Sequence, residues 1–125
     1  MDQEIFGGSI RVRDGTLEGV GTDGRVRWQW STPELCVSGV ATIPGSKDAL
    51  VLAERVSSLP RGARTLFRCR PDGTRSWTAE VLADYDGTYV EARIEGDEVM
   101  ANTWDGRLVS IDIETGKIKN VEFVK

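Results

Sequence analysis

Apolar and polar residues alternate with a period of two along most of the chain. The clearest run extends from Thr88 to Glu95, and its expected inward-facing residues are Val90, Ala92 and Ile94, with Glu91, Arg93 and Glu95 facing outward. Alternation of this kind predicts half-buried β-strands. Glycine-containing turns recur roughly every eight to twelve residues, and no segment keeps a helical period. We therefore expect an all-β protein almost without helix.

Three similar phrases recur within this pattern. They are GVGTDGRVRW from Gly19, RCRPDGTRSW from Arg68 and SIDIETGKIKN from Ser110. Each belongs to a unit with a strand that opens at a leucine, and these leucines (Leu17, Leu66 and Leu108) lie 49 and 42 residues apart. Such periods in an all-strand sequence are typical of stacked four-stranded blades. We expect one domain, 1–125, of three antiparallel meander units, approximately 5–32, 35–82 and 88–125, with three, four and four strands.

The third phrase resembles the tryptophan-docking repeat of pyrroloquinoline-quinone-type β-propellers, Ala-x-Asp-x-x-Thr-Gly-Lys-x-x-Trp. The matching residues are Asp112, Thr115, Gly116 and Lys117, whereas Ser110 replaces the alanine and Asn120 replaces the tryptophan. The resemblance implies propeller-type blades in a partial or compact small propeller. It implies neither quinoprotein activity nor a cofactor, because quinoprotein dehydrogenases of that family contain many more blades.

The four tryptophans fall into two groups. Trp28 and Trp77 occupy equivalent positions after the first two turns, so we expect their indole rings to pack between neighbouring units. Trp30 and Trp104 lie outside this equivalence, and two interpretations remain open for them: further core residues, or exposed anchors for a partner.

Three blades do not close a ring, so the open strand edges require a cover. Two solutions are consistent with the sequence. The C-terminal strand Val121–Val124 would pair beside the first unit, which lacks one strand, or two chains would together form a six-bladed ring.

The formal net charge of -4 argues against a general nucleic-acid-binding protein, which needs a surplus of Lys and Arg. Six arginines and one acid lie between Arg55 and Arg75, and seven acids and one arginine lie between Glu80 and Glu98. These two blocks would pair within one chain or between chains, or else remain solvated.

The sequence contains no histidine, which excludes the common Ser-His-Asp, Cys-His and zinc sites. A carboxylate pair such as Asp84 with Asp86 is the remaining enzymatic alternative. Glycine is absent from the sixth loop position after Asp84, so an EF-hand is excluded, leaving a looser cation site or an ordinary acidic turn. Cys36 and Cys69 are expected to be reduced, buried small hydrophobes.

The longest interruption of the repeat is the loop from Arg55 to Arg64. Long loops on regular scaffolds often carry function, and its arginines would contact an acidic partner or an anionic ligand. The full set of candidate partner-binding residues is Arg55, Arg61, Arg64, Asp84, Asp86, Glu91, Trp30 and Trp104.

Three functions are compatible with these features. The first is a non-catalytic, cytoplasmic protein-binding module, and its more specific version is an immunity protein that neutralises a cognate basic toxin through the acidic stretch Glu80–Glu98. The second is a self-assembling structural propeller subunit, and the third is a carboxylate-dependent enzyme. If the first function is correct, we expect the chain to bind a protein partner. We expect it to bind no cofactor, metal, nucleic acid or membrane. The acidic N-terminal residues and the short apolar runs underlie the cytoplasmic expectation.

Overall fold

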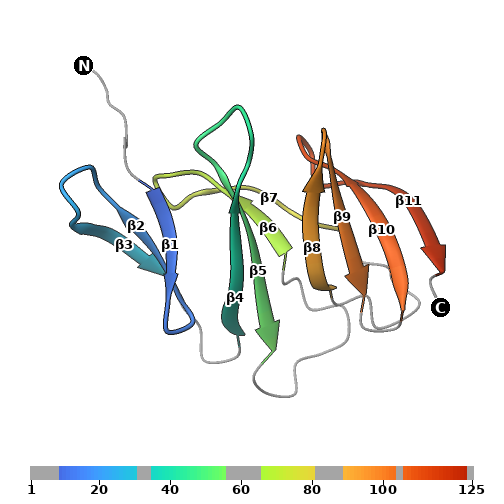
Figure 1. The fold of residues 1–125 in the computed structure, drawn as a ribbon, viewed down its shortest axis with the longest axis horizontal. Helices are drawn as coiled ribbons and strands as arrows, with labels where there is room; N and C mark the ends of the chain where they lie inside the picture. Colours follow the sequence, from blue (N-terminus) through green and yellow to red (C-terminus); the bar gives the residue numbers. More distant parts are fainter. Residues whose placement is uncertain (1–8, 31–34, 56–65, 81–88, 104–105, 124–125) are drawn as a thin grey trace.

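Figure 1 shows a computed structural model that describes residues 9–30, 35–55, 66–80, 89–103 and 106–123. Eleven strands form three separate antiparallel sheets, and no helix occurs among these residues. The prediction of an all-β fold built from three blade-type units is confirmed.

Each sheet is a meander in which strands consecutive in the chain are also neighbours in space. The first sheet contains β1 (Ser9–Arg13), β2 (Thr16–Val20) and β3 (Val26–Trp30). The second contains β4 (Leu35–Thr42), β5 (Ala49–Arg55), β6 (Leu66–Cys69) and β7 (Arg75–Thr78). The third contains β8 (Tyr89–Glu95), β9 (Glu98–Thr103), β10 (Arg107–Asp112) and β11 (Ile118–Phe123). The three sheets lie beside one another in chain order (Figure 1).

Tight turns join the strands where the sequence supplies residues for positive φ. Asp14 and Gly15, between β1 and β2, have φ of 52° and 77°. Two consecutive positive φ values match the right-handed twist of an antiparallel pair, and Asp and Gly tolerate them best. Asp14 and Gly15 therefore supply the conformation that the hairpin between β1 and β2 needs.

The hydrophobic core forms two layers, one on each face of the second sheet. Between the first and second sheets lie Leu17, Val37, Ala49, Val51, Phe67 and Cys69. Between the second and third lie Leu66, Trp77, Tyr89, Val99, Ala101, Val109 and Ile111, among others. Because successive side chains of a strand point to opposite faces, β6 places Leu66 in one layer and Phe67 in the other. The middle sheet is thus covered on both faces, and each end sheet on one.

Two expectations are wrong. Val90 does not face inward: it is 42% exposed, because the register of β8 against β9 shifts between Tyr89 and Glu91 and leaves Val90 as the extra residue of a bulge. Tyr89 is buried in its place. The C-terminal strand does not pair beside the first sheet either, because it continues β11, in which Phe123 lies opposite Arg107 of β10.

Candidate protein-binding surfaces

Two tryptophans connect the three sheets. Trp28 of β3 donates a hydrogen bond from Nε1 to the carbonyl of Pro71 (2.7 Å), and its ring lies over Gly73. Trp77 of β7 repeats this arrangement in the next pair of sheets. Its Nε1 donates to the carbonyl of Ile113 (2.9 Å), and its ring lies over Gly116. The predicted packing of both indole rings between neighbouring units is confirmed.

The glycines at these turns are required by the close approach of the rings. A Cβ atom on Gly116 would lie 2.6 Å from Trp77 Cε3, and one on Gly73 would lie 3.0 Å from Trp28 Cδ2. Both glycines also have positive φ, 75° and 92°. Only glycine satisfies both conditions without strain.

Arg68 reinforces the second contact. Its Nε lies 2.7 Å from Asp48 Oδ2 within the second sheet, and its Nη1 donates to the same Ile113 carbonyl that accepts from Trp77 (2.9 Å). Nη1 also lies 3.6 Å from Glu114 Oε2. Arg68, a member of the arginine-rich block, thus connects the second and third sheets. Its ion pairs are with Asp48 and Glu114, which lie outside the acidic block Glu80–Glu98.

The outward surface of the first sheet differs from its equivalents in the other two sheets. Glu18 directly follows Leu17, just as Phe67 follows Leu66 and Val109 follows Leu108. Phe67 and Val109 are buried against the preceding sheet, whereas Glu18 lies on the surface turned away from the second sheet. We call the side chains of Arg11, Arg13, Glu18 and Gln29 the first outer face.

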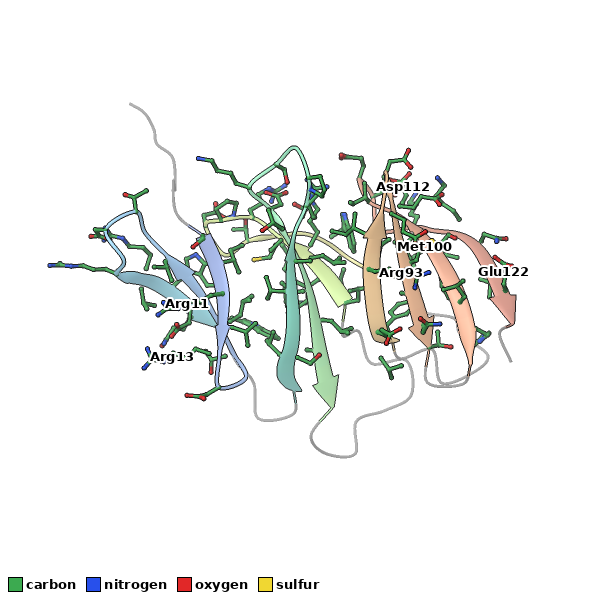
Figure 2. The ribbon with its side chains drawn as sticks, viewed as in Figure 1. Arg11, Arg13, Arg93, Met100, Asp112 and Glu122 are labelled. Atoms are coloured by element: carbon green, nitrogen blue, oxygen red, sulfur yellow. The ribbon has the colours of Figure 1, made fainter. Side chains whose placement is uncertain are left out.

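Glu18 remains 3% exposed because its neighbours cover it. Gln29 Nε2 donates to Oε2 (2.7 Å), and Arg11 Nε donates to Oε1 (2.9 Å). These two hydrogen bonds lower the pKa of Glu18 below its ordinary value. A carboxylate without such partners would be costly at this position. Figure 2 shows Arg11 and Arg13 on the side of the first sheet away from the second.

The outward surface of the third sheet has a different composition. Cross-strand register places Arg93, Met100 and Ser110 in one row and Glu91, Asn102, Leu108 and Glu122 in the next. Together with Glu95, Glu98, Asp112, Lys119 and Asn120, they form what we call the last outer face. It carries five carboxylates against two cations. Arg93, Met100, Asp112 and Glu122 are labelled there in Figure 2.

Two positions of the last outer face correspond to positions that the other sheets bury. Leu17 and Leu66 are almost fully buried by the following sheet, but Leu108 is only half-buried. Asn120 stands where the first two sheets have their docking tryptophans, and it is exposed. No described part of the chain packs on this face.

The structure describes only some of the candidate partner-binding residues. Glu91 is exposed on the last outer face. Trp30 is half-buried, with its ring edge-on to Phe67 (centroids 5.4 Å apart) and the guanidinium of Arg75 5.1 Å from its centroid. This fits the core interpretation of Trp30 rather than that of an exposed anchor. Arg61, Arg64, Asp84, Asp86 and Trp104 lie outside the described residues, as does the side chain of Arg55.

Two buried ionisable groups, Cys69 and Tyr89, belong to the core. Cys69 is free, and burial raises the pKa of its thiol to about 11. Burial also raises the pKa of Tyr89, whose hydroxyl donates to the carbonyl of Glu80 (2.6 Å). The described part of the chain contains no group of three or more His, Cys, Asp or Glu side chains that would hold a metal ion. The same part of the chain contains no helix long and apolar enough to cross a membrane.

A family described as a domain of unknown function (DUF7957) matches residues 47–123, which is more than half of the chain. The chain belongs to this family. No curated protein matches the DUF7957 chain.

The crystal structure of BamB from Moraxella catarrhalis is similar to the DUF7957 chain, with a TM-score of 0.64 and 21% sequence identity. The similarity covers 94% of this chain and 33% of the BamB chain, so the DUF7957 chain spans about a third of its length. At this identity the likeness shows the fold alone, which is of the β-propeller blade type.

Sequence reasoning identified the indole contacts but missed the two outer faces. The signal was present in the alignment of the three units. Glu18, at the position of Phe67 and Val109, places a charge where the other units bury an apolar side chain.

Proposed function

We propose that the protein is a non-catalytic, cytoplasmic protein-binding module that binds a basic partner protein through the last outer face. The more specific form of this proposal is an immunity protein that neutralises a cognate basic toxin. We also assign the blades to the pyrroloquinoline-quinone type, with the tryptophan-to-turn contacts as support.

The observation that carries the proposal is the half-buried Leu108 on an otherwise acidic sheet face that no described residue covers. Its equivalents, Leu17 and Leu66, are buried by a following sheet, so the position is suited to apolar contact. Met100 lies nearby on the neighbouring strand and is also half-buried. A small apolar centre with a charged rim is the usual composition of a protein-binding site.

The charge of the rim favours a basic partner. Glu91 and Glu122 are exposed and lie in the same row of the sheet as Leu108. Glu98 is partly neutralised by Lys119, which lies 2.7 Å away and whose pKa is raised by that hydrogen bond. Glu95 is ion-paired with Arg93, so Glu91, Asp112 and Glu122 are the carboxylates that would steer a cationic partner toward the face and fix its orientation.

The experiment is a calorimetric titration of the chain with each protein encoded next to it, at low and high ionic strength. A complex of submicromolar affinity with a basic protein, weakened by salt, is the expected result. The double substitution Glu91→Gln, Glu122→Gln should weaken binding about tenfold, since two charged contacts at a rim would be lost. The matched control is Asp14→Asn with Asp72→Asn, which changes the net charge equally at exposed turn residues of the first and second sheets, away from this face. Equal weakening by both pairs, or no submicromolar complex, would contradict the proposal.

A second candidate is self-assembly, which the opposite charges of the two outer faces favour. Arg11 and Arg13 project from the first outer face, and the last outer face is acidic. Sedimentation should then show an oligomer that Arg13→Glu dissociates and that adding Glu91→Arg restores. A monomer at every ionic strength would dispose of this candidate.

A further inference from the structure

The three sheets contain equivalent turns between their last two strands, each closed by the same kind of backbone hydrogen-bond pair, and the turn of the third sheet is one residue longer. In the first sheet, the N–H of Gly21 donates to the carbonyl of Arg25 (2.8 Å) and that of Gly24 to the carbonyl of Gly21 (2.9 Å). In the second sheet, the N–H of Arg70 donates to the carbonyl of Thr74 (2.8 Å) and that of Gly73 to the carbonyl of Arg70 (2.9 Å). In the third sheet, the N–H of Asp112 donates to the carbonyl of Lys117 (2.9 Å) and that of Gly116 to the carbonyl of Asp112 (2.8 Å). Each turn contains a glycine with positive φ. The turn of the first sheet therefore matches that of the second residue for residue.

In the second and third sheets, that surface holds an indole ring. The ring N–H donates to the carbonyl of Pro71 in the second sheet and of Ile113 in the third. Pro71 directly follows Arg70, and Ile113 directly follows Asp112. The ring plane lies over the positive-φ glycine. Two independent examples within one chain thus show what this turn geometry binds.

The turn of the first sheet holds no indole ring of any described residue. Gly24 has a φ of 81°, and no described atom lies within 4 Å of the position where its Cβ would be. Thr22 occupies the position of Pro71 and Ile113, so its carbonyl corresponds to the acceptor. Thr22, Asp23 and Gly24 are all exposed.

We propose that the turn Thr22–Gly24 is a docking site for a tryptophan side chain of a partner protein. The Thr22 carbonyl accepts the indole N–H, and the backbone of Gly24 receives the ring. A second copy of the chain lacks the matching donor, because Asn120 stands at the position of Trp28 and Trp77. The inference goes beyond the proposed function, since it concerns the opposite end of the molecule.

The charge around the turn indicates which tryptophan-bearing segment fits. Arg25, with 83% of its side chain accessible, lies beside the turn, and its Nε is 3.8 Å from Asp23 Oδ2. Arg27 Nη2 lies 3.0 Å from the same carboxylate, so the turn carries two cations and one carboxylate. A preceding blade of the usual apolar kind would meet the ion-paired Glu18 here, so an apolar sheet is a poor occupant. We assign the site to an indole flanked by carboxylates.

Nuclear magnetic resonance provides the test. The nitrogen-15-labelled chain is titrated with an acidic pentapeptide that has a central tryptophan, and the amide shifts of Thr22 and Gly24 are followed. Both amides should shift in a saturable manner. The same peptide with N-methylated indole should bind about tenfold more weakly, because the donor of the hydrogen bond is lost.

A blocking substitution completes the test. Gly24→Asn keeps a residue that tolerates positive φ, but its Cβ would occupy the space of the incoming ring. Gly45→Asn is the matched control, since Gly45 has a φ of 80° and equally open surroundings in a different turn. Binding should be lost in the first variant and retained in the second. An unresponsive Gly24 amide in the wild type, or equal binding by Gly24→Asn or by the methylated peptide, would overturn the proposal. Neither result bears on the partner of the last outer face, which depends on Glu91 and Glu122.

Discussion

Replacing Trp77 by phenylalanine tests whether the indole contact holds the second and third sheets together. The substitution removes the hydrogen bond from Nε1 to the carbonyl of Ile113 (2.9 Å). That carbonyl keeps its bond from Arg68 Nη1, so it is not left unsatisfied, and the loss is at the lower end of the range for a buried bond, about 1 kcal/mol. The smaller ring also leaves a cavity of about 40 Å³ beside Gly116, which costs about 1 kcal/mol more. The free energy of unfolding should therefore fall by about 2 kcal/mol.

Circular dichroism during thermal and urea unfolding measures this loss without relying on tryptophan fluorescence. A change of about 2 kcal/mol corresponds to a decrease of about 6–10 °C in the Tm of a chain of this size. Trp28→Phe is the internal comparison. Trp28 makes the equivalent bond to Pro71, but its ring is only half-buried, so its loss should cost about 1 kcal/mol. The reasoning would be refuted if Trp77→Phe were as stable as the wild type, or if Trp28→Phe were the more damaging substitution.

Three further outcomes follow from the same structure. Gly116→Ala should destabilise the protein at least as much as Trp77→Phe in the same unfolding assay, because the new Cβ would meet the indole at 2.6 Å in a backbone with φ of 75°. The pKa of Glu18 is lowered in the folded state, so its ionised side chain stabilises the fold above its unfolded pKa, and this stabilisation disappears as the pH falls through the folded pKa. Urea unfolding between about pH 5 and pH 3 should therefore show the free energy of unfolding falling faster in the wild type than in Glu18→Gln. Cys69 is buried and its thiol has a pKa of about 11, so it should resist alkylation at pH 8 in the native protein and react after unfolding. Mass spectrometry of the alkylated peptide measures the rate, and rapid modification of the native protein would contradict the placement of Cys69 in the core.

The sequence was sufficient for the blade architecture because two independent signals agreed. Glycine turns fixed where strands end, and tryptophans at matching offsets fixed which units are equivalent. The Asp14-Gly15 hairpin was predictable for the same reason, since both residues favour the φ values that the turn needs.

The orientation of Val90 was not predictable from alternation. One additional residue in a strand reverses every side chain beyond it, and nothing in the letters of β8 marks Tyr89, rather than Val90, as the residue that enters the core. The prediction that the C-terminal strand pairs beside the first sheet was wrong for a similar reason. Its pattern suits any open sheet edge, and proximity in the chain to β10 decides the pairing.

The candidate surfaces needed the structure because they depend on which side of each sheet is covered. Glu18 looks like an ordinary polar strand residue until Arg11 and Gln29 are seen around it. The proposed loop arginines and the Asp84-Asp86 pair stay predictions, since they lie outside the described residues.

The direction of the indole contacts means that each tryptophan leaves the ribosome before the turn that binds it. Each donor precedes its acceptor: Trp28 binds Pro71, which is 43 residues later, and Trp77 binds Ile113, which is 36 residues later. On the ribosome, each large aromatic side chain therefore emerges before the turn that shelters it, and remains in contact with solvent or a chaperone until the next sheet has left the exit tunnel. Because Asn120 occupies the equivalent position of the third sheet, that sheet leaves the ribosome without an unsheltered indole at this site.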